Sequence, residues 1–427
     1  MDGQSFTRVP TSALKVGTKL GAPIFDQKQT KLIAAGMKLT APMLDRLHER
    51  LIDSVVVSIG DFARMQSFKP QGRARHAVAD RAAPLVQQRS VESDFLDTQS
   101  KGKKTGPIVG TGEKFSDRMR KPEPVSYTPG LLEHLTERTE QRLLQLETLA
   151  DNCMKKAELD LNTTKEVTRE SLEGIKNDID SMICLAGNPC GFSYPMRHSF
   201  HTAMLATAMG TNLGLNEQEL MDLGIGCLIH DIGMLRVQSS IREARRKLSD
   251  EEYAEIARHP LHTLDMLQDS THRLSLASRM IAYQMHERID GGGYPRKSNI
   301  DEIHPLARLA SVADTYLALV SPRPHRAGML SYCAMEMMIR KASQGQFDPA
   351  AVRALVQTVG LFPIGSYVSL SHQWLGRVIR VRSNNYTQPV VEVWRPSNLQ
   401  ATPAIVDLSQ DSTLKIERPL VALSRNG

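Results

Sequence analysis

The sequence predicts a mainly α-helical protein with a small α+β module before the helices and a small β appendage after them. Residues 130–186 contain few helix breakers, and their apolar residues recur at three- and four-residue steps. Residues 197–362 are also helical in character, with short breaks that contain Gly or Pro. After Pro363 the pattern changes to short alternating runs such as YVSL and GRVIRV, which are typical of strands.

The first 62 residues predict the small α+β module. TKLGAPIFD, KLIAAGMKL and SVVVSI have strand character, and Thr40 with Pro42 can begin a short helix. Residues 63–128 predict a basic disordered linker, because they are rich in Gly, Pro, Ser and Gln. Residues 64–125 hold 13 Lys or Arg against 7 Asp or Glu, which accounts for the net charge of +6. A nucleic-acid arm is the alternative, but the segment has no known binding motif, so we expect no nucleic-acid partner.

Residues 129–187 predict one long helix or a helical hairpin that leads into the core. Its apolar stripe suits either a homodimer seam or ordinary core packing, and the pattern does not separate the two. The main helical domain is expected over residues 188–362, and the β appendage over residues 363–427.

Composition favours a cytoplasmic protein. The N-terminal residues MDGQSFTRVP lack a secretory signal, and no run approaches the roughly 18 apolar residues that a membrane span needs. We therefore expect no membrane association. The five cysteines are odd in number and form no CxxC pair, so buried thiols are expected rather than disulfides.

Histidines and aspartates recur at regular intervals in the main helical domain. His198, His230, His259, His286 and Asp314 are separated by 32, 29, 27 and 28 residues. One helix with its connection fills about that length, so successive elements can each bring one ligand to a common centre. Imidazole and carboxylate groups bind Mn, Fe, Zn and similar divalent ions.

The stretch LIHDIGML places His230 and Asp231 side by side in an apolar run. A carboxylate has two oxygens, so Asp231 can bridge two ions, whereas the imidazole of His230 binds one. A hydrogen-bonded core histidine with a helix-ending aspartate is the alternative. Burying several unpaired polar groups in one domain would be costly, which favours the metal site.

A second motif, QMHERIDGGGYPRK, follows at residues 284–297. Its glycines permit a tight turn and a close approach of the backbone to a ligand. Together with HSFHTAML, LIHDIGML, ARHPLHTLDML, ARLASVADTYLAL, SPRPHRAGM and QFDP, the region from Arg197 to Pro349 resembles the HD-GYP family of bacterial cyclic di-GMP phosphodiesterases. This family is a branch of the HD superfamily of metal-dependent phosphohydrolases.

The resemblance implies an all-helical HD-type domain that hydrolyses cyclic di-GMP by a metal-bound hydroxide in bacterial second-messenger signalling. The implied metal ligands are His198, His230, Asp231, His259, His286 and Asp314. They would hold two divalent metal ions, Fe or Mn. His230 and Asp231 would be central to catalysis. The implied substrate-binding residues are Gly293, Tyr294, Arg323 and Arg326. It also implies partner proteins such as GGDEF domains, bound through the GYP segment.

Three positions depart from the family pattern. Met285 replaces the first of two adjacent histidines, Met234 replaces a lysine that commonly follows HDIG, and Tyr194 stands where members with three metals carry a glutamate. Two alternatives therefore stay open: a catalytically degenerate protein that acts as a cyclic di-GMP receptor or interaction scaffold, and a phosphohydrolase for another nucleotide.

Overall fold

The computed structural model describes most of the chain outside the segment 66–105. The described residues are 6–11, 14–25, 31–40, 43, 44, 47, 54–58, 61, 65, 106–120, 129–155, 160–186, 195–244, 246–321, 328–382, 385–395, 402–411 and 413–420. They fall into two compact units, one built mainly from the N-terminal residues and one from the remainder, and each unit is described by itself.

The N-terminal unit contains a four-stranded antiparallel sheet. Its strands are β1 (Phe6–Pro10), β2 (Ile24–Phe25), β3 (Lys31–Ile33) and β4 (Ser54–Ser58), in the order β1-β4-β2-β3. Successive side chains of β4 point to opposite faces of the sheet, so Val55 and Val57 are fully buried whereas Val56 between them is only partly buried. The buried carboxylate of Asp61 accepts hydrogen bonds from the backbone N–H groups of Gly21 and Ala22, which fixes the turn before β2.

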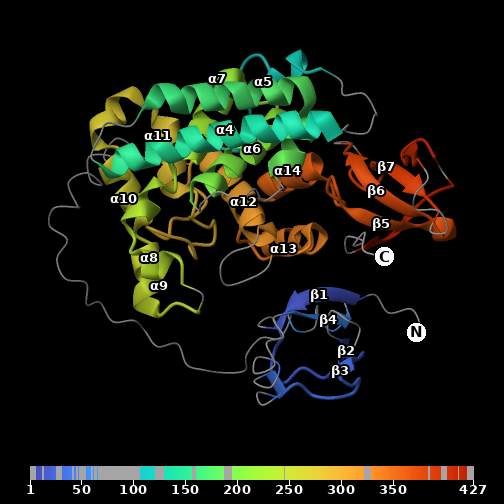
Figure 1. The fold of residues 1–427 in the computed structure, drawn as a ribbon. Helices are drawn as coiled ribbons and strands as arrows, with labels where there is room; N and C mark the ends of the chain where they lie inside the picture. The colour runs from blue at the N-terminus through green and yellow to red at the C-terminus, as the bar shows by residue number, and fades with distance from the viewer. Residues whose placement is uncertain are drawn as a thin grey trace. The chain divides into compact units, whose positions relative to one another are not determined.

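The second unit is built around a helical bundle (Figure 1). Its helices are α4 (Pro129–Met154), α5 (Leu161–Ala186), α6 (Met196–Asn212), α7 (Glu217–Ile229), α8 (Ser239–Arg242), α9 (Asp250–Ile256), α10 (His259–Met266), α11 (Leu276–Gln284), α12 (Pro305–Val320), α13 (Ser331–Ser343) and α14 (Pro349–Val359), with 3₁₀ turns η3 (Ile232–Arg236) and η4 (Gln268–Arg273). α6 is buried along nearly its whole length, because α5, α7, α12 and α14 all pack against it. The prediction of a mainly α-helical fold is confirmed.

Two helices, α4 and α5, occupy the segment expected as one long helix or a hairpin, and they run alongside each other (Figure 1). The buried guanidinium of Arg142 on α4 forms an ion pair of 2.6 Å with Glu170 on α5. α5 is interrupted at Asp178, whose φ of −158° and ψ of 97° are extended rather than helical.

Part of the expected linker differs from the prediction of disorder. Residues 106–120 lie along the helical bundle and contain the short 3₁₀ turn η2 (Phe115–Arg118), in which Phe115 is buried. The backbone N–H of Phe115 donates to the carbonyl oxygen of Leu215, and Thr111 hydrogen-bonds to the carboxylate of Glu219 at the start of α7. The basic composition of this segment did not indicate that residues 106–120 are ordered, because backbone groups and the buried side chain of Phe115 make contacts with the helical bundle.

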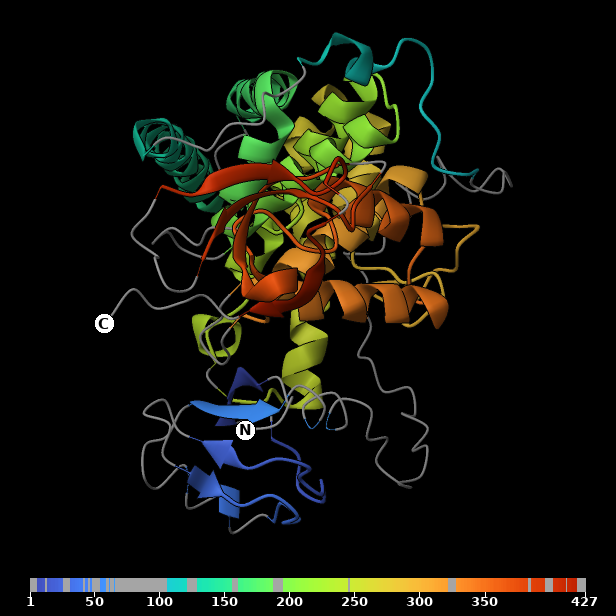
Figure 2. The same cartoon turned by 90° about the vertical axis from the view of Figure 1, so that its right-hand side faces the viewer.

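The C-terminal part of the second unit is a curved five-stranded antiparallel sheet (Figure 2). Its strands are β5 (Tyr367–Leu370), β6 (Leu375–Arg380), β7 (Val390–Trp394), β8 (Ala404–Asp407) and β9 (Ile416–Leu420), in the order β8-β7-β6-β5-β9. The sheet is tied to the helical bundle by Arg380 of β6, whose Nη1 donates hydrogen bonds of 2.9 and 2.8 Å to the two carboxylate oxygens of Asp178 of α5. Among the helices that the structure describes, none is long and apolar enough to cross a membrane.

Candidate metal centre

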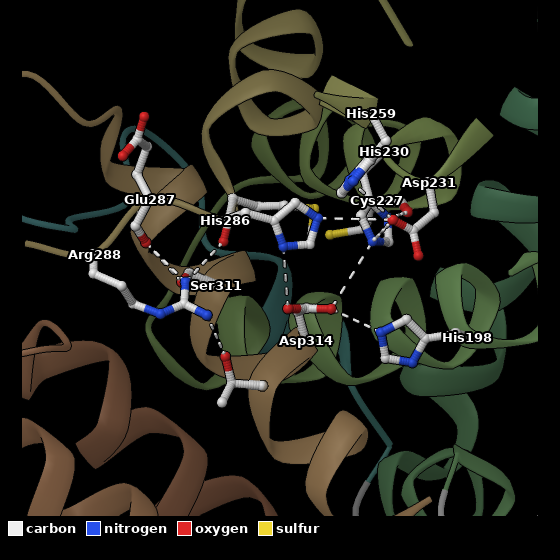
Figure 3. A network of polar contacts seen from close by, with 12 residues as sticks. His198, Cys227, His230, Asp231, His259, His286, Glu287, Arg288, Ser311 and Asp314 are labelled. Carbon is white, nitrogen blue, oxygen red and sulfur yellow. Dashed lines mark hydrogen bonds and ion pairs between the residues drawn. The ribbon is translucent and has the colours of Figure 1, made fainter. Parts of the chain in front are cut away.

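Five helical elements each bring one or two of the predicted ligands to the middle of the bundle. His198 lies on α6, His230 and Asp231 at the end of α7, His259 at the start of α10, and Asp314 on α12. His286 lies two residues beyond the end of α11. All six side chains are buried and point toward one another (Figure 3). The structure therefore gathers the residues that the regular spacing predicted.

The carboxylate of Asp314 is the centre of one half of this cluster. Its Oδ1 lies 2.7 Å from Nε2 of His198 and 3.9 Å from Nε2 of His230, and its Oδ2 lies 3.6 Å from Nδ1 of His286. His198, His230 and Asp314 each offer a ligand atom within one small volume. This group is able to hold a metal ion.

The carboxylate of Asp231 is the centre of the other half. Three histidine Nε2 atoms lie around its Oδ1, those of His230 at 3.3 Å, His259 at 3.2 Å and His286 at 3.7 Å. Each of these three nitrogens is buried and makes no hydrogen bond to the part of the chain that the structure describes. Buried polar atoms are normally paired, so three convergent nitrogens beside one carboxylate fit a divalent cation.

Hydrogen bonds to backbone carbonyl groups fix the ring orientation and the tautomer of two of the histidines. Nδ1 of His230 donates a hydrogen bond of 2.7 Å to the carbonyl of Cys227, and Nδ1 of His259 donates one of 2.8 Å to the carbonyl of Ile256. A proton on Nδ1 leaves the lone pair on Nε2, which faces Asp231 in both residues. This is the arrangement in which metal-binding histidines are usually held.

The protonation states also suit cations. Burial lowers the pKa of His286 to about 4 and lowers the pKa of His230, because a charged imidazole is disfavoured away from water. Burial alone would raise the pKa of Asp231 and Asp314. The surrounding histidines outweigh it and hold the pKa of both carboxyls below the usual range. His230 and His286 are therefore neutral, and Asp231 and Asp314 are ionised.

The close packing of Gly233 explains why the HDIG turn can lie so near α10. A Cβ at this position would overlap the carbonyl oxygen of His259 and the backbone nitrogen of Thr263. The hydroxyl of Thr263 accepts a hydrogen bond from the backbone N–H of Gly233. Glycine thus allows the turn that carries His230 and Asp231 to contact the helix that carries His259.

The GGGYP segment forms a wall beside His286. A Cβ at Gly293 would overlap the backbone of Glu287 and Arg288, so only glycine allows this approach. The ring of Tyr294 stacks on the imidazole of His286, with centroids 5.0 Å apart and planes 17° apart. Gly293 and Tyr294 thus lie at the cluster. The other two predicted substrate-binding residues, Arg323 and Arg326, lie outside the described residues, as does Tyr194.

Arg288 joins the chain after α11 to α12. Its guanidinium donates hydrogen bonds of 2.7 Å to the hydroxyl of Ser311 and 3.0 Å to that of Thr315, which flank Asp314 on the helix (Figure 3). It also lies over the ring of Phe347, 4.8 Å from the centroid. These contacts hold His286 and Asp314 at a fixed separation, and nothing in the sequence pattern marked Arg288 or Thr263 for such a role.

The two methionines that depart from the family pattern, Met234 and Met285, are both buried. Met285 is 0% exposed and Met234 is 4% exposed. They pack as core residues beside the cluster. The six polar ligand candidates converge without either thioether.

The comparisons with known proteins agree with this geometry. A family model described as an HD domain matches residues 180–351. The chain is 34% identical over 220 residues to the cyclic di-GMP phosphodiesterase PA4108 of Pseudomonas aeruginosa, an alignment that covers 51% of this chain and 52% of that protein. It is 30% identical over 228 residues to the cyclic di-GMP phosphodiesterase response regulator RpfG of Xanthomonas campestris pv. campestris, covering 53% of this chain and 55% of that protein.

The HD match contains both the His230–Asp231 pair and the Gly293–Tyr294–Pro295 segment that packs on His286. This domain belongs to the HD-GYP family. The family resemblance predicted from the motifs is thereby confirmed. The HD-GYP domain is also 31% identical over 179 residues to the 3'3'-cGAMP-specific phosphodiesterase 3 of Vibrio cholerae serotype O1, covering 42% of this chain and 38% of that protein.

The chain spans about half the length, or less, of these curated relatives. The similarity therefore concerns the HD-GYP domain and part of its surroundings. Within this domain, the His and Asp clusters are able to bind metal ions.

Proposed function

We propose that this protein is a metal-dependent phosphodiesterase that hydrolyses cyclic di-GMP. The observation that carries the proposal is the convergence of three buried histidine Nε2 atoms, those of His230, His259 and His286, on the carboxylate of Asp231. The names of two relatives that resemble the HD-GYP domain support cyclic di-GMP as the substrate. Either the linear dinucleotide or GMP would be the final product.

The proposed ligands are the six residues of the cluster, and the two carboxylate oxygens of Asp231 would allow it to serve more than one ion. His230, His259 and His286 surround Asp231, whereas His198 and Asp314 form the opposite side. The ions, which we propose to be Fe or Mn, would activate a water molecule and stabilise negative charge on the phosphoryl oxygens.

The chain itself would position the substrate and keep the site ready for cations. Neutral His230 and His286 and ionised Asp231 and Asp314 need no proton transfer before ligation. Gly293 and Tyr294 form the wall against which the substrate would lie. Arg323 and Arg326 are proposed to bind its phosphates, because guanidinium groups pair their donors with phosphoryl oxygens.

A second candidate function is a cyclic di-GMP receptor or scaffold with little turnover. The observation that favours it is the methionine pair, because Met285 and Met234 replace a ligand-type and a cationic side chain of the family motif. A phosphodiesterase for another cyclic dinucleotide is the third candidate, in line with the name of the Vibrio cholerae relative.

The deciding experiment measures metal content per chain after anaerobic purification, and then turnover of cyclic di-GMP and 3'3'-cGAMP with Mn or Fe supplied. Two metals per chain with cyclic di-GMP cleavage would support the proposal. Binding without cleavage would favour the receptor, and preferential cleavage of 3'3'-cGAMP would favour the third candidate. An Asp231→Asn variant should lose metal and activity, whereas Asp265→Asn, which breaks an exposed ion pair with Arg236, should keep both.

The homodimer through residues 130–186, binding of GGDEF domains through the GYP segment, and a cytoplasmic location stay predictions.

A further inference from the structure

The segment that carries α8 and α9 leads directly into the metal centre. Two residues, Ala257 and Arg258, separate the end of α9 from His259, the first residue of α10. The backbone N–H of Ala257 donates to the carbonyl of Tyr253 at 2.9 Å. The position of Tyr253 is thus linked to that of His259 through less than two helical turns.

The start of α9 is held by local polar contacts. Ser249 and Glu252 form a reciprocal capping box, and the carboxylate of Glu252 also accepts two hydrogen bonds of 2.6 Å from Arg246. The backbone N–H of Tyr253 donates to the carbonyl of Ser249 at 2.9 Å. Tyr253 therefore stands on a short helix whose first turn is well defined.

A series of ring contacts connects Tyr253 with the cluster. Its ring meets the ring of Tyr294 edge to face, with centroids 6.2 Å apart and planes 86° apart. Tyr294 in turn stacks on His286 and meets the ring of His259 at 5.9 Å. Tyr253 lies one aromatic ring farther from the candidate metal ligands than Tyr294.

Tyr253 nevertheless remains 56% exposed. Single exposed aromatic residues are common on protein surfaces and usually need no explanation. Here the exposed ring belongs to an ordered helix, contacts the wall of the candidate site, and stands outward of two buried histidines. An exposed aromatic face in that position is suited to a flat ligand group that enters with the phosphate.

We propose that Tyr253 is a base-stacking residue of the substrate site and that one guanine of a cyclic dinucleotide lies on its ring. This inference rests on the proposed function. A phosphodiester at the cluster carries its ribose and base outward, toward the rings that rim the site. Stacking tolerates many bases, so Tyr253 would strengthen binding while groups elsewhere select the base.

The test compares Tyr253→Ala and Tyr253→Phe with the unmodified full-length protein, loaded with Mn. Tyr253→Ala should raise KM for cyclic di-GMP about 5- to 100-fold, the range that loss of one base–aromatic stack gives, with metal content and kcat unchanged. Tyr253→Phe should keep the KM, because the ring remains. Tyr386→Ala removes another exposed tyrosine, 42% exposed and situated after β6, and should change nothing.

A spectroscopic readout separates stacking from a structural role. In Tyr253→Trp, cyclic di-GMP should quench the added indole fluorescence, whereas ribose 5-phosphate, which has no base, should not. Equal quenching in the unmodified protein, from Trp374 and Trp394, would overturn the inference. So would an unchanged KM, or an unchanged Kd where cleavage is absent, in Tyr253→Ala. If the unmodified protein neither binds nor cleaves a cyclic dinucleotide, the proposed function fails, and this inference fails with it.

Discussion

The hydroxyl of Thr263 donates a hydrogen bond of 2.8 Å to the carbonyl oxygen of His230 and accepts one of 3.0 Å from the N–H of Gly233. One buried side chain on α10 thereby satisfies both ends of the turn that carries Asp231. The same helix begins with His259. Thr263 therefore fixes the turn with His230 and Asp231 relative to the helix that begins with His259, so two elements that carry candidate ligands are held together.

Thr263→Val should weaken both the fold and metal binding. The substitution keeps the shape of the side chain but leaves a buried N–H and a buried carbonyl without a partner, which costs about 1–3 kcal/mol of unfolding free energy. Loss of such a supporting contact also lowers metal affinity, by about 10- to 100-fold. Urea unfolding and a Mn titration would measure the two effects.

Thr202→Val is the matched control for that substitution. The hydroxyl of Thr202 is buried and makes no hydrogen bond to any residue that the structure describes. Removal of this hydroxyl should leave the free energy of unfolding unchanged or raise it, because no other buried group loses a hydrogen-bond partner. An equal loss of stability in both variants would show that the hydrogen bonds of Thr263 are not the cause.

Gly233→Ala should displace the turn from α10, because the added methyl group would overlap the backbone of His259 and Thr263. Overpacking of this kind costs about 1–3 kcal/mol. We expect lower thermal stability and less than half of the metal content per chain. Gly106→Ala is the control, because a Cβ at Gly106 would meet nothing within 4 Å. Full metal content in Gly233→Ala would contradict the role of this close contact.

Met285→Leu should leave metal content and activity within about twofold, because the buried side chain acts by packing and a swap of similar volume is tolerated in cores. Met285→His places another imidazole in the core and should lower stability unless a metal ion binds it. Metal analysis and turnover on both variants provide the check. A tenfold or larger gain of activity in Met285→His would instead favour the degenerate receptor.

The folded state should lose stability as the pH falls from about 6.5 toward 4. Burial lowers the pKa of His201 to about 3 and that of His304 to about 4, so the unfolded chain binds these protons first. Each histidine contributes a slope of about 1.4 kcal/mol per pH unit in that window. Asp180 acts in the opposite direction, because burial raises its pKa to about 7 and the folded state takes up its proton first.

Urea unfolding of the metal-free protein at pH 7 and pH 5 would measure this loss. His201→Leu removes one titrating group and should reduce the loss by about 2 kcal/mol. An identical loss in the variant and the unmodified protein would show that His201 takes up its proton equally in the folded and unfolded chains.

The bundle and the convergence of the six candidate ligands could be predicted from sequence because each rests on a pattern along the chain. Helical periodicity with Gly and Pro breaks locates the helices, and histidines and aspartates that recur at intervals of about one helix and its connection indicate one candidate ligand on each successive element. The proposed base-stacking role of Tyr253 could not be predicted, since an exposed tyrosine in a polar helix resembles any other surface residue. Order in residues 106–120 depends on backbone contacts with Leu215, about 100 positions away, which composition does not encode.

The hydrogen bonds between Arg380 and Asp178 show that the segment matched by the HD family model is shorter than the segment that folds together. The HD match begins at residue 180, inside α5, and ends at residue 351, inside α14. A fragment cut at those limits would lose the first part of α5 and the whole C-terminal sheet, so the buried Asp180 would be left without Arg380. Gene fusions or expression vectors designed on the matched region alone would therefore interrupt two helices. The smallest workable unit should run from about residue 106 to residue 420.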